Sequence, residues 1–277
     1  MNRSALLAVV PLVLVASTLH AQGVLIAPTA VFIDARSRTA SLMVVNPNDQ
    51  TAEVEIGTLF GYPVTDSTGQ LILRTVEAPD STLPSAAAWI KPFPRRMTLV
   101  PHAQQTVRLL VTPPPGLPDG EYWARIVVTA RGGQIPMTAA SDSGGVRVGL
   151  SVEVRTILPL LYRKGRLRGE LAMSALRAER SGDSLVIQAH FERTGTAAAL
   201  GTARGELVDS TGKARATFTT PLTAYYSVDP RFTLPLSGVL PGQYRLRFEV
   251  APGRQDLASE NIIPFKAVRD SLTVQVH

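Results

Sequence analysis

Few residues in this chain have the types and spacing that covalent chemistry requires. The run Asp-Ser-Gly-Gly within Ser141–Gly145 has the form of a loop that carries a serine nucleophile. Such a serine needs a histidine base and a buried aspartate that the fold places beside it. Beyond the first 21 residues the histidines are His102, His190 and His277, each isolated in the sequence. We therefore expect no enzyme, and interpret Ser141–Gly145 as a flexible loop.

Metal and cofactor sites have equally little support. The chain has no cysteine, and three scattered histidines do not make a zinc site. No phosphate-binding loop, dinucleotide fingerprint or H-E-x-x-H pattern is present. Asp66 and Asp209 each begin an Asp-Ser-Thr-Gly run, which is typical of a hairpin turn rather than a calcium loop. We expect no metal and no cofactor.

The two tryptophans are candidates for stacking on a sugar. Trp123 lies among the apolar residues of a strand pattern that includes Ile126 and Val128, so we expect it in the core. Trp89 lies at the edge of a segment rich in Ala, Pro and Ser, which leaves partial exposure open. If the protein binds carbohydrate, Trp89 is the first residue to test.

The most regular pattern in the chain predicts a binding strand rather than a reaction centre. An aliphatic residue stands at every second position of this stretch, and side chains alternate sides along a strand. The face so formed consists of Val146, Val148, Leu150, Val152 and Val154. Such a strand completes a sheet in its own domain or offers its edge to another protein.

The elements that position this strand are all β. Short apolar runs rich in Val, Leu, Ile and Thr are separated by Pro, Gly, Asp and Ser turns, and no run keeps a helical period. The expected strands of the first half are Val24–Ile33, Ser41–Asn46, Ala52–Phe60, Arg96–Val100, Thr106–Thr112 and Glu121–Thr129.

The second half repeats the plan of the first. The turn at Asp66 recurs at Asp209, and a Tyr preceded by a Pro/Gly turn occurs at Tyr122 and Tyr244. Both tyrosines stand where an immunoglobulin-like sandwich places its corner tyrosine. The shorter spacing of the second copy indicates an insertion in the first, over Leu73–Pro94. We predict two tandem immunoglobulin-like β-sandwich domains, 22–163 and 164–277.

The N-terminal segment 1–21 has the features of a cleaved signal peptide. Arg3 precedes an apolar stretch, and Leu19-His-Ala21 is an acceptable cleavage site. No later stretch is apolar and long enough to cross a membrane. The net charge of +6 is carried by scattered residues, mostly arginine, without the basic and aromatic platform that grips nucleic acid. With no cysteine, a bacterial periplasm is the expected location.

The order of several motifs resembles the periplasmic pilus-assembly (PapD-like) chaperone family over nearly all of the mature length. The strongest match is a stretch similar to the family's P-x-x-x-x-L-x-P motif, which leads into Q-x-x-R. The matching segments are Ile26–Ile33, Ser41–Pro47, Trp89–Pro101 with Gln104–Arg108, Pro118–Arg125 and Ile157–Gly165.

This resemblance implies a chaperone without enzymatic activity. In that family the last strand of the first domain inserts alternating aliphatic side chains into a pilus subunit that lacks a strand, until an outer-membrane usher receives it. Carried over, the donor strand is Val146, Val148, Leu150, Val152 and Val154. The expected partners are pilus or other surface-fibre subunits and an usher.

The chain departs from the family at the carboxylate anchor. Typical members hold the C-terminal carboxylate of the subunit with an Arg in the first strand and a Lys late in the last strand of the first domain. The matching positions here are Ala30 and Pro159. Arg155 and Arg163 are possible substitutes, because an arginine fork grips a carboxylate with two hydrogen bonds, although a solvated surface charge is their commoner role.

The alternative hypothesis is an exported adhesion or binding module made of two immunoglobulin-like domains. The two differ in the strand Val146–Val154. A chaperone should hold it at a sheet edge, whereas an adhesion module should bury it between two neighbouring strands.

Overall fold

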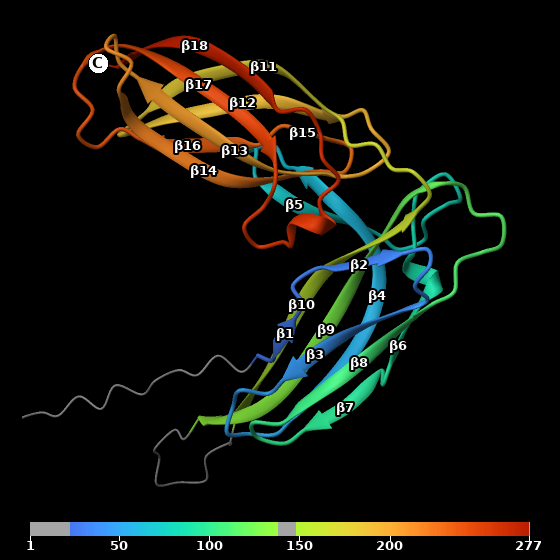
Figure 1. Ribbon diagram of the computed structural model, residues 1–277. Helices are drawn as coiled ribbons and strands as arrows, with labels where there is room; N and C mark the ends of the chain where they lie inside the picture. The colour runs from blue at the N-terminus through green and yellow to red at the C-terminus, as the bar shows by residue number, and fades with distance from the viewer. Residues whose placement is uncertain (1–22, 138–147, 277) are drawn as a thin grey trace, which may run out of the picture.

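The computed structural model describes residues 23–137 and 148–276. The expected signal peptide, the run Ser141–Gly145 and Val146 lie outside the described residues. The chain folds into two β-sandwiches (Figure 1), which confirms the all-β prediction. Two three-residue 3₁₀ segments, η1 (Ala87–Trp89) and η2 (Ser259–Asn261), are the only helical elements in the described ranges.

The first sandwich contains the strands up to β10. One sheet has the order β1-β3-β8-β6, and the other has the order β2-β10-β9-β4-β5, with β7 paired to β4. The bounds are β1 Leu25–Ala27, β2 Val31–Asp34, β3 Thr39–Val45, β4 Ala52–Thr65, β5 Leu71–Val76, β6 Ile90–Phe93, β7 Arg96–Leu99, β8 Gln104–Val111, β9 Gly120–Met137 and β10 Val148–Lys164.

The expected first strand, Val24–Ile33, is two strands in two different sheets. β1 pairs antiparallel with β3, whereas β2 pairs parallel with the end of β10. Pro28 lies between them and has no N–H to continue a ladder, so the chain leaves one sheet here and joins the other. The expected insertion Leu73–Pro94 is ordered, and contains the end of β5, η1 and β6.

The second sandwich follows after Gly165–Glu170. One sheet has the order β11-β12-β15, with β16 paired to β12, and the other has the order β14-β13-β17-β18. The bounds are β11 Leu171–Ser181, β12 Ser184–Arg193, β13 Ala199–Val208, β14 Ala214–Ala224, β15 Ser227–Val228, β16 Arg231–Pro235, β17 Gly242–Pro252 and β18 Val268–Val276.

The two Asp-Ser-Thr-Gly runs form the same turn. Oδ1 of Asp66 accepts hydrogen bonds from the backbone N–H and hydroxyl of Thr68, at 2.9 and 2.7 Å. Oδ1 of Asp209 accepts the same pair from Thr211, at 2.8 and 2.6 Å. One turn joins β4 to β5 and the other joins β13 to β14, so both are hairpin turns as predicted.

The two corner tyrosines make matching hydrogen bonds as well. Tyr122 Oη donates to the carbonyl of Pro118 at 2.9 Å, and Tyr244 Oη donates to that of Leu240 at 2.8 Å. Each bond ties the start of a long strand to the loop that precedes it. The repeated sequence therefore marks a repeated structural device.

A third apolar cluster joins the two sandwiches. Each sandwich has its own buried core, and between them lies a layer made of Phe60, Trp123, Leu161, Ala198, Leu200 and Tyr225. The β4–β5 hairpin also reaches the second sandwich, where the carbonyl of Gly69 accepts a hydrogen bond from the Arg231 N–H at 2.8 Å. Gly69 has φ +81°, and an added Cβ would lie 2.7 Å from the Arg231 Cβ, so this contact requires glycine.

Candidate functional site: the free edge of β10 and the interdomain cleft

β10 has one edge that is largely without a strand partner. Its other edge pairs with β9 from Val148 to Lys164. On the open side β2 pairs only with the stretch Leu160–Arg163. Among the described residues, no strand therefore covers this edge from Val148 to Pro159. A row of unpaired backbone groups on such an edge is a template for an added strand.

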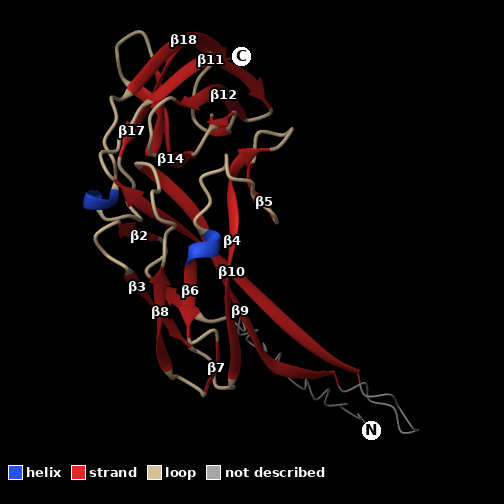
Figure 2. Ribbon diagram, turned by 90° about the vertical axis from the view of Figure 1, so that its right-hand side faces the viewer, coloured by secondary structure: helices blue, strands red, loops and turns tan. Residues whose placement is uncertain are grey.

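The first part of this edge belongs to a hairpin that projects from the body of the protein. Figure 2 shows β9 and β10 extending together beyond the rest of the first sandwich. Between the pairs Ser151–Gln134 and Glu153–Arg131, two residues of β9, Gly132 and Gly133, stand opposite one residue of β10, Val152. This bulge falls at Gly132, whose added Cβ would lie 3.0 Å from the Thr51 carbonyl oxygen. A two-stranded ribbon is marginally stable alone, which favours a partner.

The alternation predicted from the sequence is visible where β10 side chains are described. Val152 and Val154 are half-buried, and Glu153 and Arg155 are exposed. The same side of the strand continues into Leu158 and Leu160, which are buried in the first core. Val148 and Leu150 belong to β10. Val146 lies outside the described residues. The role of the five aliphatic residues in binding remains a prediction.

The free edge leads into a cleft between the two sandwiches. A cavity of about 510 Å³ lies here, and its lining includes both positions at which the resemblance implies an anchor, Ala30 and Pro159. Its rim carries large apolar side chains that are 37–45% exposed, from Leu71 and Ile72 of β5 and Ile157 of β10. An extended chain that followed the open edge would meet this apolar cleft.

Arg125 gives this cleft its net positive charge. It is 8% exposed, its Nε donates to the carbonyl of Gly61 at 3.0 Å, and its Cζ lies 5.1 Å from the centre of the Tyr225 ring. Burial raises the pKa of Tyr225 to about 12, against the opposing effect of the Arg125 charge. Arg125 forms no ion pair with any carboxylate in residues 23–137 and 148–276.

The other charges in the lining cancel each other. Arg254 donates to Asp256 Oδ1 at 2.8 Å and to Thr223 Oγ1 at 2.7 Å, and these two charges neutralise one another. The remaining lining residues are uncharged. The cavity therefore has a net charge of about +1 from Arg125. A buried charge without a counterion is costly, and an anionic group that entered the cleft would remove that cost.

The two arginines proposed from the sequence as anchors have different surroundings. Arg155 is exposed. Arg163 is not a solvated surface charge: its side chain is 12% exposed and its Nε lies 2.9 Å from Oε2 of Glu121, which is fully buried. Arg163 Nη1 also donates to the carbonyl of Asn261 at 2.7 Å. Because its guanidinium is already paired with Glu121 and bonded to Asn261 of the second sandwich, Arg163 links the two sandwiches.

Glu121 is the centre of that link. Its Oε1 accepts hydrogen bonds from the indole N–H of Trp123 at 3.0 Å and from the backbone N–H of Ala198 at 2.8 Å. Trp123 is 1% exposed, as predicted for a core residue, although the core it joins is the layer between the sandwiches. One carboxylate thus holds a strand of the first sandwich against the second.

Sequence reasoning missed Arg125, although a usable signal was present. Glu121, Trp123 and Arg125 alternate along β9, so they share one face of the strand. All three are buried. Glu and Arg are rarely buried unless they are paired, so a buried strand face that contains both of them beside a Trp is unusual. The pattern indicates a second covered face on β9, against which a domain packs.

Two further classes of site find no support in the described residues. No group of three His, Cys, Asp or Glu side chains in these ranges is placed to hold a metal ion. No helix in the same ranges is long and apolar enough to span a membrane.

Comparison with known proteins gives similar solved structures. No family model matches the chain, and no curated protein matches it. Similar structures include the YadV chaperone (15% identity, 89% of this chain and 98% of that chain, TM-score 0.46). Another is a chain of the chaperone–tip adhesion subunit complex CsuC–CsuE from the Csu pili of Acinetobacter baumannii (13% identity, 89% of this chain and 97% of that chain, TM-score 0.47). A third is the CupB2 chaperone of Pseudomonas aeruginosa (14% identity, 91% of this chain and 100% of that chain, TM-score 0.41).

Proposed function

We propose that this chain is a divergent periplasmic pilus-assembly chaperone, which captures surface-fibre subunits by strand addition to β10 and passes them to an outer-membrane usher. The observation that carries the proposal is the open edge of β10 over Val148–Pro159. An adhesion module would bury this strand between two neighbours. The motif order found in the sequence supports the same family.

The captured subunit would be held by two kinds of interaction. Backbone hydrogen bonds to the open edge supply a ladder, and the aliphatic residues of the strand fill pockets in the subunit. Each aliphatic side chain that becomes fully buried contributes roughly 1.5–3 kcal/mol. The lost translational and rotational freedom of the two proteins, and the ordering of side chains at their interface, oppose this gain. Several such side chains are therefore needed for stable capture.

The carboxylate anchor belongs, on this proposal, to Arg125. The cleft that contains Ala30 and Pro159 also contains this buried arginine without a counterion. The C-terminal carboxylate of a subunit strand seated along β10 would supply that counterion, with Ile157 and Leu71 packed beside it. Arg155 and Arg163 would take no part, because one is exposed and the other is paired with Glu121.

The test is co-expression in a bacterial periplasm with the small subunit-like proteins encoded beside this gene, followed by pull-down. Val148→Asp and Val152→Asp should abolish recovery of the subunit. The control Arg155→Asp also introduces an aspartate into β10, but at an exposed position. This variant should still recover the subunit. Equal recovery with all three variants, or no recovery with the wild type, would contradict strand addition.

A further inference from the structure

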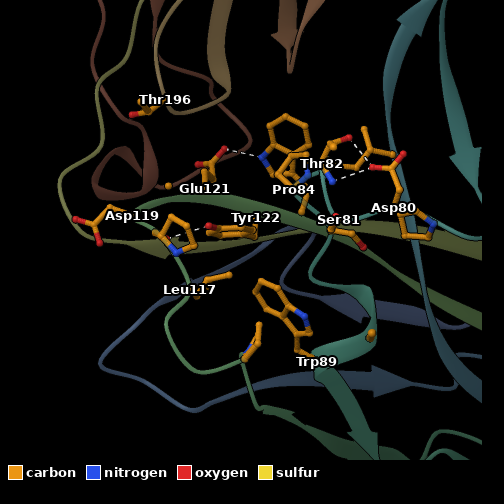
Figure 3. A pocket seen from close by; sticks show the side chains of 18 of the residues that line it. Asp80, Ser81, Thr82, Pro84, Trp89, Leu117, Asp119, Glu121, Tyr122 and Thr196 are labelled. Carbon is orange, nitrogen blue, oxygen red and sulfur yellow. Dashed lines mark hydrogen bonds between the residues drawn. The ribbon is translucent and has the colours of Figure 1, made fainter.

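A second cavity lies on another side of the interdomain layer and plays no part in the function proposed above. Its volume is about 790 Å³. The first sandwich contributes the loop 79–85, Trp89 and the start of β9, and the second contributes Arg193, Gly195 and Thr196. Figure 3 shows the Trp89 ring facing Tyr122 and Leu117 in this cavity, with Asp80 and Asp119 at opposite ends.

The apolar part of the cavity is built from aromatic rings and prolines. The rings of Trp89 and Tyr122 lie 5.2 Å apart at 51°, and Trp89 also packs edge-on against Tyr162. Both lining rings are half-buried, so part of each faces the cavity. Four prolines complete the lining: Pro79, Pro84, Pro114 and Pro118.

Trp89 also presents a hydrogen-bond donor without a partner. Its indole N–H makes no hydrogen bond to any described residue. Trp89 lines the cavity, and its indole nitrogen is not among the fully buried side-chain atoms without a partner in the described ranges, of which Nη2 of Arg163 is one. Trp123 differs, because its indole N–H donates to Glu121. Trp89 therefore brings an unpaired indole N–H donor to the aromatic wall of the cavity.

The charge of the cavity is opposite to that of the protein. The chain has a net charge of +6, yet the cavity is lined by Asp80, Asp119 and Glu121 against Arg193 alone. Glu121 is neutralised by Arg163, whereas Asp119 is exposed and forms no ion pair within the described chain. Its negative charge adds to burial in raising the pKa of Tyr122, so the carboxylate and this ring are neighbours.

We propose that this cavity binds a proline-rich segment of a partner protein that carries a lysine or arginine beside its prolines. Such a segment adopts the polyproline II helix, which has no internal hydrogen bonds and leaves its carbonyls free. Aromatic-lined grooves bind it by packing against proline rings. Trp89 and Tyr122 supply the wall, the Trp89 N–H donates to a carbonyl of the segment, and Asp119 pairs with the basic side chain.

The chemistry of the cavity favours this occupant over a glycan. A sugar presents hydroxyls around its ring, and its site needs several donors and acceptors close to the stacking ring. Here prolines and leucines surround Trp89, and Asp80 is already bound to Thr82. A single donor and a carboxylate at some distance match a peptide carbonyl followed by a charged side chain.

The test uses the two indole N–H signals in a ¹⁵N-labelled sample of the protein. The probe is acetyl-PPKPPPKPP-amide, with acetyl-PPEPPPEPP-amide and acetyl-GSKGSGKGS-amide as controls for charge and for proline. We expect the lysine–proline peptide to shift the Trp89 signal and leave that of Trp123 unchanged. Trp89→Phe, which keeps a ring against Tyr162, assigns the signal by its loss.

Affinities measured with the fluorescently labelled peptide complete the test. Trp89→Phe should weaken binding by about tenfold, and Asp119→Asn by about threefold. Asp183→Asn, an exposed aspartate of the second sandwich, should bind like the wild type. The proposal is overturned if the Trp89 signal does not shift at millimolar peptide, if either control peptide binds equally, if Trp89→Phe retains full affinity, or if chitotetraose shifts the signal and the peptide does not.

Discussion

The buried link at Glu121 yields a prediction whose size follows from its contacts. Glu121→Gln keeps the shape of the side chain but removes its charge. The amide oxygen can still accept from the Trp123 N–H and the Ala198 N–H. The amide nitrogen, however, would face the donating Nε of Arg163, now 2.9 Å from Oε2. Arg163 would then be a buried cation without a counterion.

Breaking a buried ion pair from one side costs about 3–5 kcal/mol. In a chain of this size 1 kcal/mol corresponds to about 2–4 °C in Tm, so we expect the Tm to fall by about 6–20 °C. Tryptophan fluorescence follows the change, because Trp123 lies in the layer between the sandwiches. The double variant Glu121→Gln with Arg163→Met removes both charges and should recover most of the loss.

Two results would refute this reasoning. A change in Tm of less than about 2 °C in Glu121→Gln would show that the link contributes little. A double variant less stable than Glu121→Gln would show that Arg163 stabilises the fold through contacts other than the ion pair, such as its hydrogen bond to the Asn261 carbonyl. The matched control is Glu55→Gln, which removes a carboxylate from a solvent-screened surface ion pair with Arg96, where we expect a much smaller change in Tm than in Glu121→Gln.

Three further predictions concern the repeated turns and the hairpin. Tyr122→Phe and Tyr244→Phe should each lower the free energy of unfolding by about 1 kcal/mol in urea titrations, since each removes one hydrogen bond. The Thr hydroxyl and backbone N–H groups around Asp209 lower the pKa of its carboxyl in the folded protein. Its stabilisation is therefore present above the ordinary pKa and lost as pH falls below about 4, so Asp209→Asn should flatten the acid side of the pH–stability curve. Gly69→Ala should cost about 1–3 kcal/mol by strain at positive φ and should loosen the β4–β5 hairpin, measured as faster amide exchange at Arg231.

Sequence patterns predicted the parts of the fold that depend on local chemistry. The Asp-Ser-Thr-Gly runs gave matching turns because the carboxylate bonds groups two and four residues away. The corner tyrosines could be placed for the same reason, since each bonds a carbonyl four residues before it. Period-two alternation likewise identified β10 as a strand with one apolar face.

The parts that were missed depend on residues far apart in the sequence. Arg163 meets Glu121 across 42 residues, and Glu121 meets Ala198 across 77. The alternation of Glu121, Trp123 and Arg125 along β9 does not show which residues of the second sandwich cover that face. The division of Val24–Ile33 between two sheets was missed because both halves read as strand, and only the pairing partners differ.

The most direct test of the central proposal is amide hydrogen exchange along β10, with and without a bound fibre subunit. Along Val148–Leu158, apart from the β-bulge between Ser151 and Glu153, the amides alternate between those that face β9 and those that face the open edge. We predict that the open-edge amides exchange quickly in the free protein and become protected in the complex, while those that face β9 change little. A complex that leaves the open-edge amides unprotected would contradict strand addition and show that the subunit binds elsewhere.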